Sequence, residues 1–274
     1  MRAGRTILAV ATAAGLAACG PGAERPIGQG RSADPVELVG LWRVHAEAED
    51  DDTWLRLDAD EFQLWRGAGF VDGGWDASES TLVATAWGRV GEGGTGDLEP
   101  GWLVGTHTYR RTDEGWELLD DDGEPLATMT VDGAPEPIPS AVEELARAPD
   151  VTDEVRRGLR PPVPLPEGLT SADADRLAGR RWVPAEGSYD TDPHVVLHED
   201  GSWTGSDGCN AAGGHWAVPD GGRLLSTVGP TTAIGCDGAP VGWWLGGAAL
   251  AGFDGLTLVL LDREGAELGR LVRG

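Results

Sequence analysis

The chain has 274 residues, a formal net charge of −25 and 40% hydrophobic residues, with 12 tryptophans among them. A charge this negative argues against nucleic acid or an anionic surface as the binding partner. The hydrophobic content is sufficient for one or two packed domains, which excludes disorder along the whole chain.

Residues 1–18 are predicted to be a secretory leader. Arg2 and Arg5 precede an uncharged stretch whose apolar part is too short to remain as a membrane-spanning helix. The stretch ends at residues 16–19 in Leu-Ala-Ala-Cys, which resembles the bacterial lipobox, where a cysteine is lipidated and the leader is removed in front of it. We therefore expect Cys19 to carry acyl chains such as palmitate and to anchor the protein to the cell membrane, facing outside the cytoplasm. The alternative is an ordinary signal peptide with a chance cysteine.

After a flexible tether expected at residues 19–35, two parts of the chain repeat one pattern. The region from about 36 to 133 is echoed by the region from about 176 to 274. Four matching pieces keep their order in both regions: Leu38–Trp42 with Leu177–Trp182, Leu57–Asp60 with Leu197–Asp200, Gly73–Trp75 with Gly213–Trp216, and Leu118–Gly123 with Leu260–Gly265. We predict a duplicated domain whose first copy has diverged further.

Each copy has mainly β patterning, because short apolar runs alternate with turns rich in glycine and aspartate. In the second copy, residues 240–250 place apolar side chains at helical spacing, begin with proline and precede Gly252, which predicts one helix packed on the sheet. The first copy has Pro100 in the matching place, but β-branched residues follow, so a helix there is left open. The predicted fold class is α+β, mainly β, with a small antiparallel sheet in each copy.

Residues 134–175 separate the two copies and are rich in proline, including the run at 161–166. This composition predicts a stiff, extended linker. Ser140 with Glu143 resembles a capping box, and residues 152–159 could add a helical turn or two, so short helices are expected within the linker.

A glycine-cysteine-asparagine block and a later threonine-cysteine element stand out in the second copy: Gly205, Gly208, Cys209, Asn210, Gly214, Trp216, Thr232 and Cys236. With these residues the region 176–274 resembles the META domain, the HslJ-like family of exported bacterial domains. The resemblance implies a small α+β domain with no agreed catalytic activity. The chain departs from the family at Ala212, where an aromatic residue is common. The first copy lacks the cysteine and the asparagine, so its membership rests on the repeat.

We expect structural roles for this block. Glycines at 205, 208, 213 and 214 would let a strand turn tightly, and Asn210 would bond nearby backbone groups. Cys209 and Cys236 are the cysteines that remain after lipidation of Cys19, and an even pair in an oxidising compartment usually forms a disulfide. The alternative to this bond is two buried thiols held apart by geometry.

Few other residues suggest chemistry. His194 and His198 would face the same side of a strand, as two metal ligands can, but no third ligand of matching placement follows, which favours solvated histidines. The acidic run at 47–52 lacks the alternating ligands and central glycine of a calcium loop, which favours an exposed acidic turn. We therefore predict no catalytic residue, no metal and no cofactor.

The predicted helix contains Trp243 and Trp244, and its spacing assigns Trp244 to the core. If Trp243 is exposed next to a groove, it becomes the candidate anchor for an interaction. Taken together, the sequence favours a membrane-anchored, non-enzymatic binding or envelope-stress module whose protein or small-molecule partner is unknown. The alternatives are a cell-envelope enzyme, which needs titratable groups that converge in a cleft, and a purely structural stress-response lipoprotein.

Overall fold

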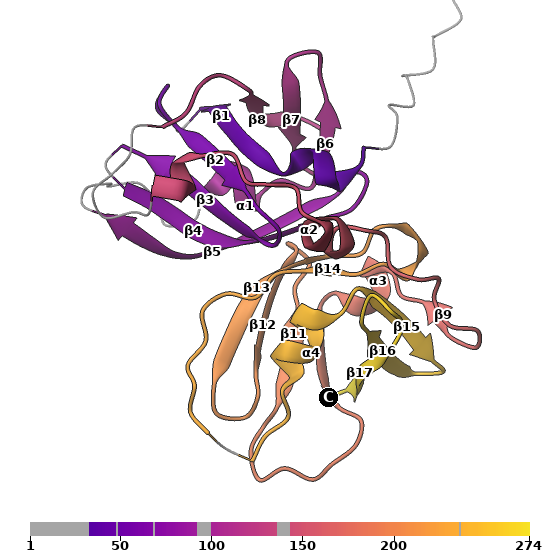
Figure 1. Ribbon diagram of the computed structural model, residues 1–274. Coiled ribbons are helices and arrows are strands. Elements are labelled where there is room, and N and C mark those ends of the chain that lie inside the picture. The colour runs from indigo at the N-terminus through magenta and orange to yellow at the C-terminus, as the bar shows by residue number, and fades with distance from the viewer. Residues whose placement is uncertain (1–32, 48, 68, 92–99, 136–142, 236) are drawn as a thin grey trace, which may run out of the picture.

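The computed structural model describes residues 33–47, 49–67, 69–91, 100–135, 143–235 and 237–274. Cys19 and Cys236 lie outside these ranges. The described strands form two antiparallel sheets, one in each lobe of a two-lobed molecule, with part of the segment between the repeats lying at the junction (Figure 1). The predicted class, α+β and mainly β, is confirmed.

The first lobe contains an eight-stranded sheet with the order β5-β4-β3-β2-β1-β8-β7-β6. The two end strands, β5 and β6, come close to each other: Thr81, just before β5, forms an antiparallel bridge with Thr108 of β6. The sheet therefore curls towards a barrel. The inside is filled by large apolar side chains, among them Trp75 and Trp116. The strands are β1 (Gly40–Ala46), β2 (Trp54–Leu57), β3 (Glu61–Arg66), β4 (Gly69–Ala77), β5 (Leu82–Gly91), β6 (Thr108–Arg111), β7 (Gly115–Leu119) and β8 (Pro125–Thr130).

The second lobe contains a nine-stranded sheet with the order β14-β13-β12-β11-β10-β17-β16-β15-β9. A bridge between Arg223 and Leu250 again brings the two ends of the curled sheet together. The core holds Trp182, Trp203 and the inner residues of the helix α4. The strands are β9 (Thr170–Ser171), β10 (Arg180–Pro184), β11 (His194–Leu197), β12 (Ser202–Ser206), β13 (Ala211–Ala217), β14 (Leu225–Ser226), β15 (Leu250–Asp254), β16 (Thr257–Leu261) and β17 (Glu267–Arg273).

The repeat in the sequence corresponds to a repeat in the structure. Without β9, the second sheet has the strand order of the first, and a helix stands at the same point of each, α1 (Gly101–Val104) after β5 and α4 (Val241–Gly247) after β14. A short helical turn precedes the first strand of each copy, η1 (Pro35–Leu38) and α3 (Ala174–Leu177). The indole N–H of Trp42 donates to the carbonyl of Leu38 at 2.8 Å, and that of Trp182 donates to Leu177 at 3.2 Å.

The helices differ in length from the prediction. The helix predicted over 240–250 ends at Gly247, because Leu250 pairs with Leu261 in the sheet and both side chains are buried there. In the first copy a single helical turn, α1, is retained. The remaining short helices are η2 (Glu143–Ala146), α2 (Asp153–Gly158) and η3 (Asp220–Gly222). No helix within the described ranges has the length and apolar character needed to cross a membrane.

The segment 134–175 was expected to be an extended linker with short helices; the short helices are present as η2 and α2, but the expectation of an extended linker needs correction. Ala146 packs into a cluster with Trp54 and Trp65 of the first lobe, and α2 contributes Val155 to the first core. Thr152 caps α2, with its hydroxyl accepting from the N–H of Val155 at 3.2 Å, while Ser140 of the expected capping box lies outside the described residues. The segment is held because its sparse apolar side chains are buried.

The same segment also completes the second lobe. Its strand β9 pairs with β15, and Leu165 and Leu169 pack against the cluster that contains Leu250. The N–H of Ala172 donates to the carbonyl of Ala251 at 3.1 Å. The predicted boundary at residue 176 therefore cuts through the packing of the second sheet.

Candidate ligand site between the repeats

The two repeats meet through equivalent edge strands. β5 packs against β13, and β14 packs against β4 and β5. Thr85 and Thr227 occupy equivalent positions in the two repeats. The carbonyl oxygen of Thr85 lies against Gly73, and the carbonyl oxygen of Thr227 lies against Gly214 in the same way. The buried hydroxyls of the two threonines are 2.6 Å apart. Equivalent residues touch each other in this way at the two-fold axis of a symmetric dimer, so the lobes are arranged as a pseudo-dimer.

Further hydrogen bonds fix the two lobes relative to each other. The buried guanidinium of Arg223 donates to the carbonyl of Ala77 at 2.8 Å and to the carboxylate of Glu79 at 3.1 Å. The indole N–H of Trp87 donates to the carbonyl of Val228 at 2.8 Å. Because buried polar groups lose stabilisation when a partner is removed, these bonds favour one fixed arrangement of the lobes.

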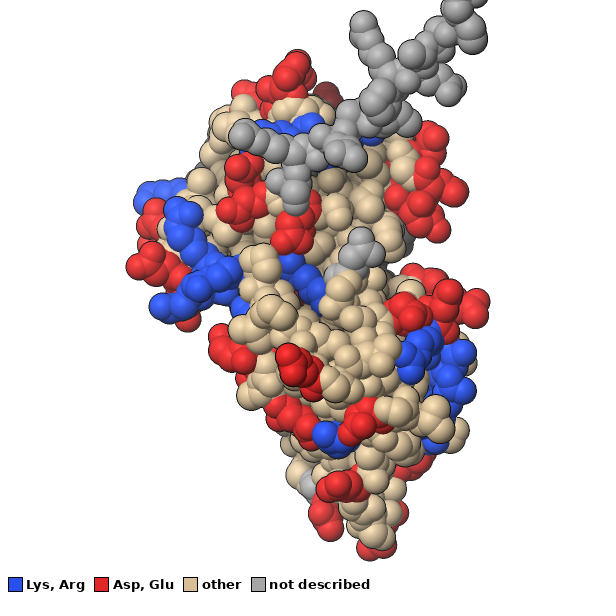
Figure 2. Space-filling model, turned by 90° about the vertical axis from the view of Figure 1, so that its right-hand side faces the viewer, with Lys and Arg blue, Asp and Glu red and all other residues tan. Residues whose placement is uncertain are grey.

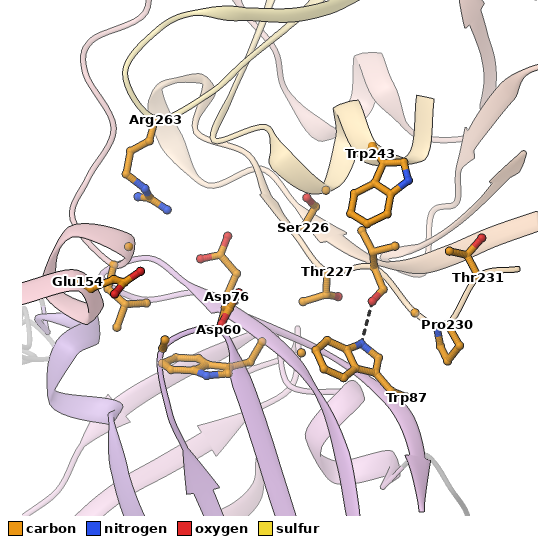
Figure 3. Close-up of a pocket in the computed structure, with 18 residues that line it drawn as sticks. Asp60, Asp76, Trp87, Glu154, Ser226, Thr227, Pro230, Thr231, Trp243 and Arg263 are labelled. Atoms are coloured by element: carbon orange, nitrogen blue, oxygen red, sulfur yellow. Dashed lines mark hydrogen bonds between the residues drawn. The ribbon is translucent and has the colours of Figure 1, made fainter. Parts of the chain in front are cut away.

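A cavity of about 810 Å³ lies beside this interface. Its volume is in the range of small-molecule sites, roughly 300–1,000 Å³. Both repeats and α2 supply its walls (Figure 3). Its polar and aromatic lining includes Asp60, Trp75, Asp76 and Trp87 from the first repeat, Glu154 from α2, and Ser226, Thr227, Thr231, Trp243 and Arg263 from the second.

Asp76 and Arg263 point towards one another in this cavity (Figure 3). Asp76 is partly buried near the end of β4, and its carboxylate accepts the backbone N–H of Ala77 at 2.8 Å and that of Ser226. Burial raises the pKa of Asp76 to about 6, although the positive charges of Arg263 and Arg223 act in the opposite direction. The cavity therefore contains a carboxyl group that titrates close to neutral pH.

Arg263 has donor capacity left for a ligand. It lies in the turn after β16, is partly buried and donates to the backbone carbonyl of Arg160. Burial lowers the pKa of its guanidinium, while the charge of Asp76 raises it. Within the described ranges the guanidinium of Arg263 makes no ion pair and no second hydrogen bond, although a guanidinium offers five N–H donors.

Trp243 has the position that an interaction anchor requires. Its side chain is 70% exposed, and it lines the cavity. Trp244, by contrast, is partly buried and packs on the second core, as its helical spacing predicted. Figure 3 places Trp243 on α4 and Trp87 on the opposite repeat, so an aromatic ring borders the cavity from each lobe.

Asn210 holds two loops of the second repeat together and lies outside the cavity lining. Its side chain is 7% exposed and donates to the carboxylate of Asp207 and to the carbonyl of Ile234, both at 2.8 Å. Its amide oxygen accepts from the hydroxyl of Thr232 at 2.6 Å and from the N–H of Ile234 at 2.7 Å. The side chain of Asn210 thus bonds backbone groups, as expected, but those of Ile234 in a second loop and not those of its own turn.

Glycine is required in this block for two different structural reasons. Gly208 has φ 111° in the turn between β12 and β13, so the expectation of a tight turn holds for it. Gly205, Gly213 and Gly214 lie inside strands, where that expectation is wrong. They are glycines because neighbouring atoms approach the backbone: a Cβ at 214 would overlap the carbonyl oxygen of Thr227. Nearby, the indole of the buried Trp216 donates to Ser202 at 2.9 Å.

Cys209, His194 and His198 do not line the cavity. Cys209 is disulfide-bonded, but Cys236 lies outside the described residues, so the pairing of the two stays a prediction. His194 donates through Nδ1 to the carbonyl of Asp192 at 2.8 Å, and His198 hydrogen-bonds through Nε2 with a threonine hydroxyl at 2.9 Å. Within the described ranges no three histidine, cysteine or acidic residues are placed to hold a metal ion.

The acidic run at 47–52 is only partly the exposed turn that was expected. The carboxylate of Glu49 points inwards and is almost fully buried, where it pairs with the guanidinium of Arg66. It also accepts the indole N–H of Trp102 at 2.6 Å. The expectation of exposure is wrong for Glu49, because its charge is compensated inside the lobe.

Asp76→Asn is expected to stabilise the protein at neutral pH. The unfolded carboxyl loses its proton near pH 3.8 and the folded one near pH 6, so the free energy of unfolding falls as pH rises between these values. Removing the charge should raise that free energy by on the order of 2 kcal/mol at pH 7.5 and leave it unchanged near pH 4. Urea unfolding at both pH values checks this, with the exposed Asp113→Asn as control. An equal effect at both values would contradict the buried charge.

Comparisons with known proteins give no relative from which a function could be inferred. No family model, no curated protein and no solved structure matches the chain. The function is therefore inferred from the cavity and from the residues that build it.

Proposed function

We propose that the protein is an exported lipoprotein whose two META-like domains bind a small ligand between them without catalysing a reaction. The lipobox resemblance at residues 16–19 supports the membrane anchor through Cys19. The glycine-cysteine-asparagine block of the second copy, together with the shared strand order of both lobes, supports the META-like domains. A partner inside the cytoplasm is not expected for a protein anchored on the outer side of the membrane.

One observation carries the proposal of binding: both repeats build the cavity, with Asp76 and Arg263 facing each other in it. Neither repeat alone contains the whole site. A fixed lobe interface keeps the opposed groups in place before a ligand arrives, which reduces the entropy lost on binding. A purely structural lipoprotein would have no need of a carboxyl group that is kept partly buried at the expense of stability.

A cell-envelope enzyme is the second candidate, because one observation favours it. The pKa of Asp76 is raised to about 6 by burial, which suits a general acid or base, and the carboxylates of Asp60 and Glu154 line the same cavity. The two candidates differ in the fate of the ligand. A bound ligand recovered unchanged after prolonged incubation supports binding alone, while a modified one supports an enzyme.

Native mass spectrometry of the purified mature chain tests the cavity. Gly158 lines it, and a side chain at this position has open space, so Gly158→Phe would fill part of the volume without a clash at Cβ. Gly101→Phe is the matched control, since Gly101 is also exposed and unobstructed but lies outside the cavity lining. We expect a small molecule on the wild type and on the control, and its loss from Gly158→Phe. A ligand retained by Gly158→Phe would place binding elsewhere.

Cys19→Ala is expected to abolish the membrane anchor. Without the thiol no acyl chain can be attached, and a lipid anchor depends on at least two chains or signals for firm binding. The variant should accumulate with its leader uncleaved or be released, and cell fractionation followed by a high-salt wash would show the difference. Cys209→Ala controls for the loss of a cysteine as such. A washed membrane fraction that still held Cys19→Ala cut at residue 18 would require a different anchor.

A further inference from the structure

We infer that the cavity between the repeats takes a neutral saccharide, bound by hydrogen bonds to Asp76 and Arg263 and by stacking on Trp243 and Trp87. The inference rests on the proposed function, since it names the class of ligand for the same cavity. It follows from three properties of the lining: its charge, its hydrogen-bonding groups and its aromatic rings.

The charge of the lining disfavours an anionic ligand, and Arg263 disfavours a cation placed next to Asp76. Three carboxylates, those of Asp60, Asp76 and Glu154, line the cavity together with one guanidinium, that of Arg263. On a chain of net charge −25, with acidic side chains spread over both lobes (Figure 2), an anion would be repelled. A cation beside Asp76 would meet Arg263, which already faces that carboxylate (Figure 3). A neutral ligand avoids both penalties.

The opposed charged groups match hydroxyl groups, which both donate and accept. A carboxylate only accepts hydrogen bonds and a guanidinium only donates them. A sugar hydroxyl placed between the two can therefore donate to Asp76 and accept from Arg263. Such hydrogen bonds to charged groups are stronger than those between neutral groups, about 1.5–3 kcal/mol each. Within the described ranges the guanidinium has unused donors for this role.

The aromatic rings suit the flat, C–H-bearing face of a pyranose. Trp243 is 70% exposed, which leaves the indole open to a ligand. The N–H of Trp87 is already used by the carbonyl of Val228, so this residue offers its ring to the cavity (Figure 3). An aromatic side chain gives contact area at low entropic cost. A volume of about 810 Å³ is sufficient for roughly two or three sugar rings.

Calorimetric titration of the mature chain tests the ligand class with probes of matched size. The neutral probes are triacetylchitotriose, cellotriose, maltotriose and mannotriose, the cationic probe is the glucosamine trimer, and the anionic probe is trigalacturonate. We expect at least one neutral trisaccharide to bind and both charged probes to bind at least tenfold more weakly. Trp243→Ala and Arg263→Gln should each weaken that binding tenfold or more. Leu256→Ala, which removes an 87% exposed side chain outside the cavity lining, should leave it unchanged.

The outcomes separate the inference from the proposed function. Preference for a charged probe, or binding of no neutral probe, overturns the saccharide inference. In that case the proposed function still holds if native mass spectrometry finds a small molecule on the wild type that is lost from Gly158→Phe. Neutral binding that is equally strong in Trp243→Ala and Arg263→Gln also overturns the inference, because the sugar then lies elsewhere. If no probe binds and Gly158→Phe changes nothing, both proposals fail.

Discussion

Gly214→Ala is expected to lower the free energy of unfolding of the protein by about 3 kcal/mol, because a methyl group has no room inside β13. The new Cβ would overlap the carbonyl oxygen of Thr227 and lie 2.8 Å from the indole nitrogen of Trp203. That indole donates to the same carbonyl at 2.9 Å. Relief of the overlap must move Thr227, and this breaks a buried hydrogen bond.

The effect should extend beyond the second lobe. The hydroxyl of Thr227 contacts that of Thr85 at the pseudo-two-fold axis, so a displaced Thr227 also loosens the interface between the repeats. Urea unfolding followed by circular dichroism measures the loss of stability. Gly235→Ala is the matched control, since a Cβ there has open space. A loss under about 0.5 kcal/mol for Gly214→Ala would mean that the strand relaxes without strain and that our explanation of this glycine is wrong.

The sequence predicted the repeated β architecture because its signals are local and occur twice. Three of the four shared pieces mark the ends of strands: they end or begin a strand, as at Leu57 and Leu197, or form the turn before the last strand of a copy, as at Asp120 and Asp262. In both turns the aspartate accepts the N–H two residues later, at 3.0 Å. Spacing that is set by local hydrogen bonds survives divergence, which is why the duplication could be recognised before the sheets were known.

The cavity could not be predicted in the same way, because its central residues lie where the copies differ. Asp76 follows the shared tryptophan of the first copy, where the second copy has Ala217. Arg263 stands in the last turn of the second copy, where the first copy has Asp121. Comparison of the two copies therefore does not single out Asp76 or Arg263 as a candidate site residue. Only the lobe interface brings them together, and no sequence period encodes it.

Proline content misled the prediction for residues 134–175. Proline at high density indicates an extended backbone, and the run at 161–166 forms neither helix nor strand. It says nothing about the scattered apolar side chains beside the prolines. Leu165 and Leu169 cover the place on β15 where Gly252 has no side chain, with Leu165 and Leu169 carbons 3.1 Å from a Cβ built there. The missing side chain at Gly252 thus leaves space on the sheet for Leu165 and Leu169, which hold the segment there.

A fragment of residues 161–274 is expected to fold cooperatively, and one of residues 176–274 to be far less stable. The shorter fragment lacks β9, leaves the Leu250 cluster exposed and loses the aspartate at 173 whose side chain caps α3 by accepting from Arg176 at 2.8 Å. Two partly buried leucines contribute about 1–2 kcal/mol each and a helix cap about 1 kcal/mol. A loss of about 3–5 kcal/mol is a large part of the 5–15 kcal/mol that a domain has.

Thermal unfolding of both fragments by circular dichroism tests this expectation, with size-exclusion chromatography to detect association. Leu165→Ala with Leu169→Ala in the longer fragment should reproduce most of the loss, because only the strand and the cap remain. The exposed Leu256→Ala is the control for removing a leucine. Equal midpoints for the two fragments would restore the boundary at 176 and reduce the preceding segment to a connector. A shorter fragment that aggregates while the longer one stays monomeric would be explained by the free edge of β15, which β9 covers in the whole chain.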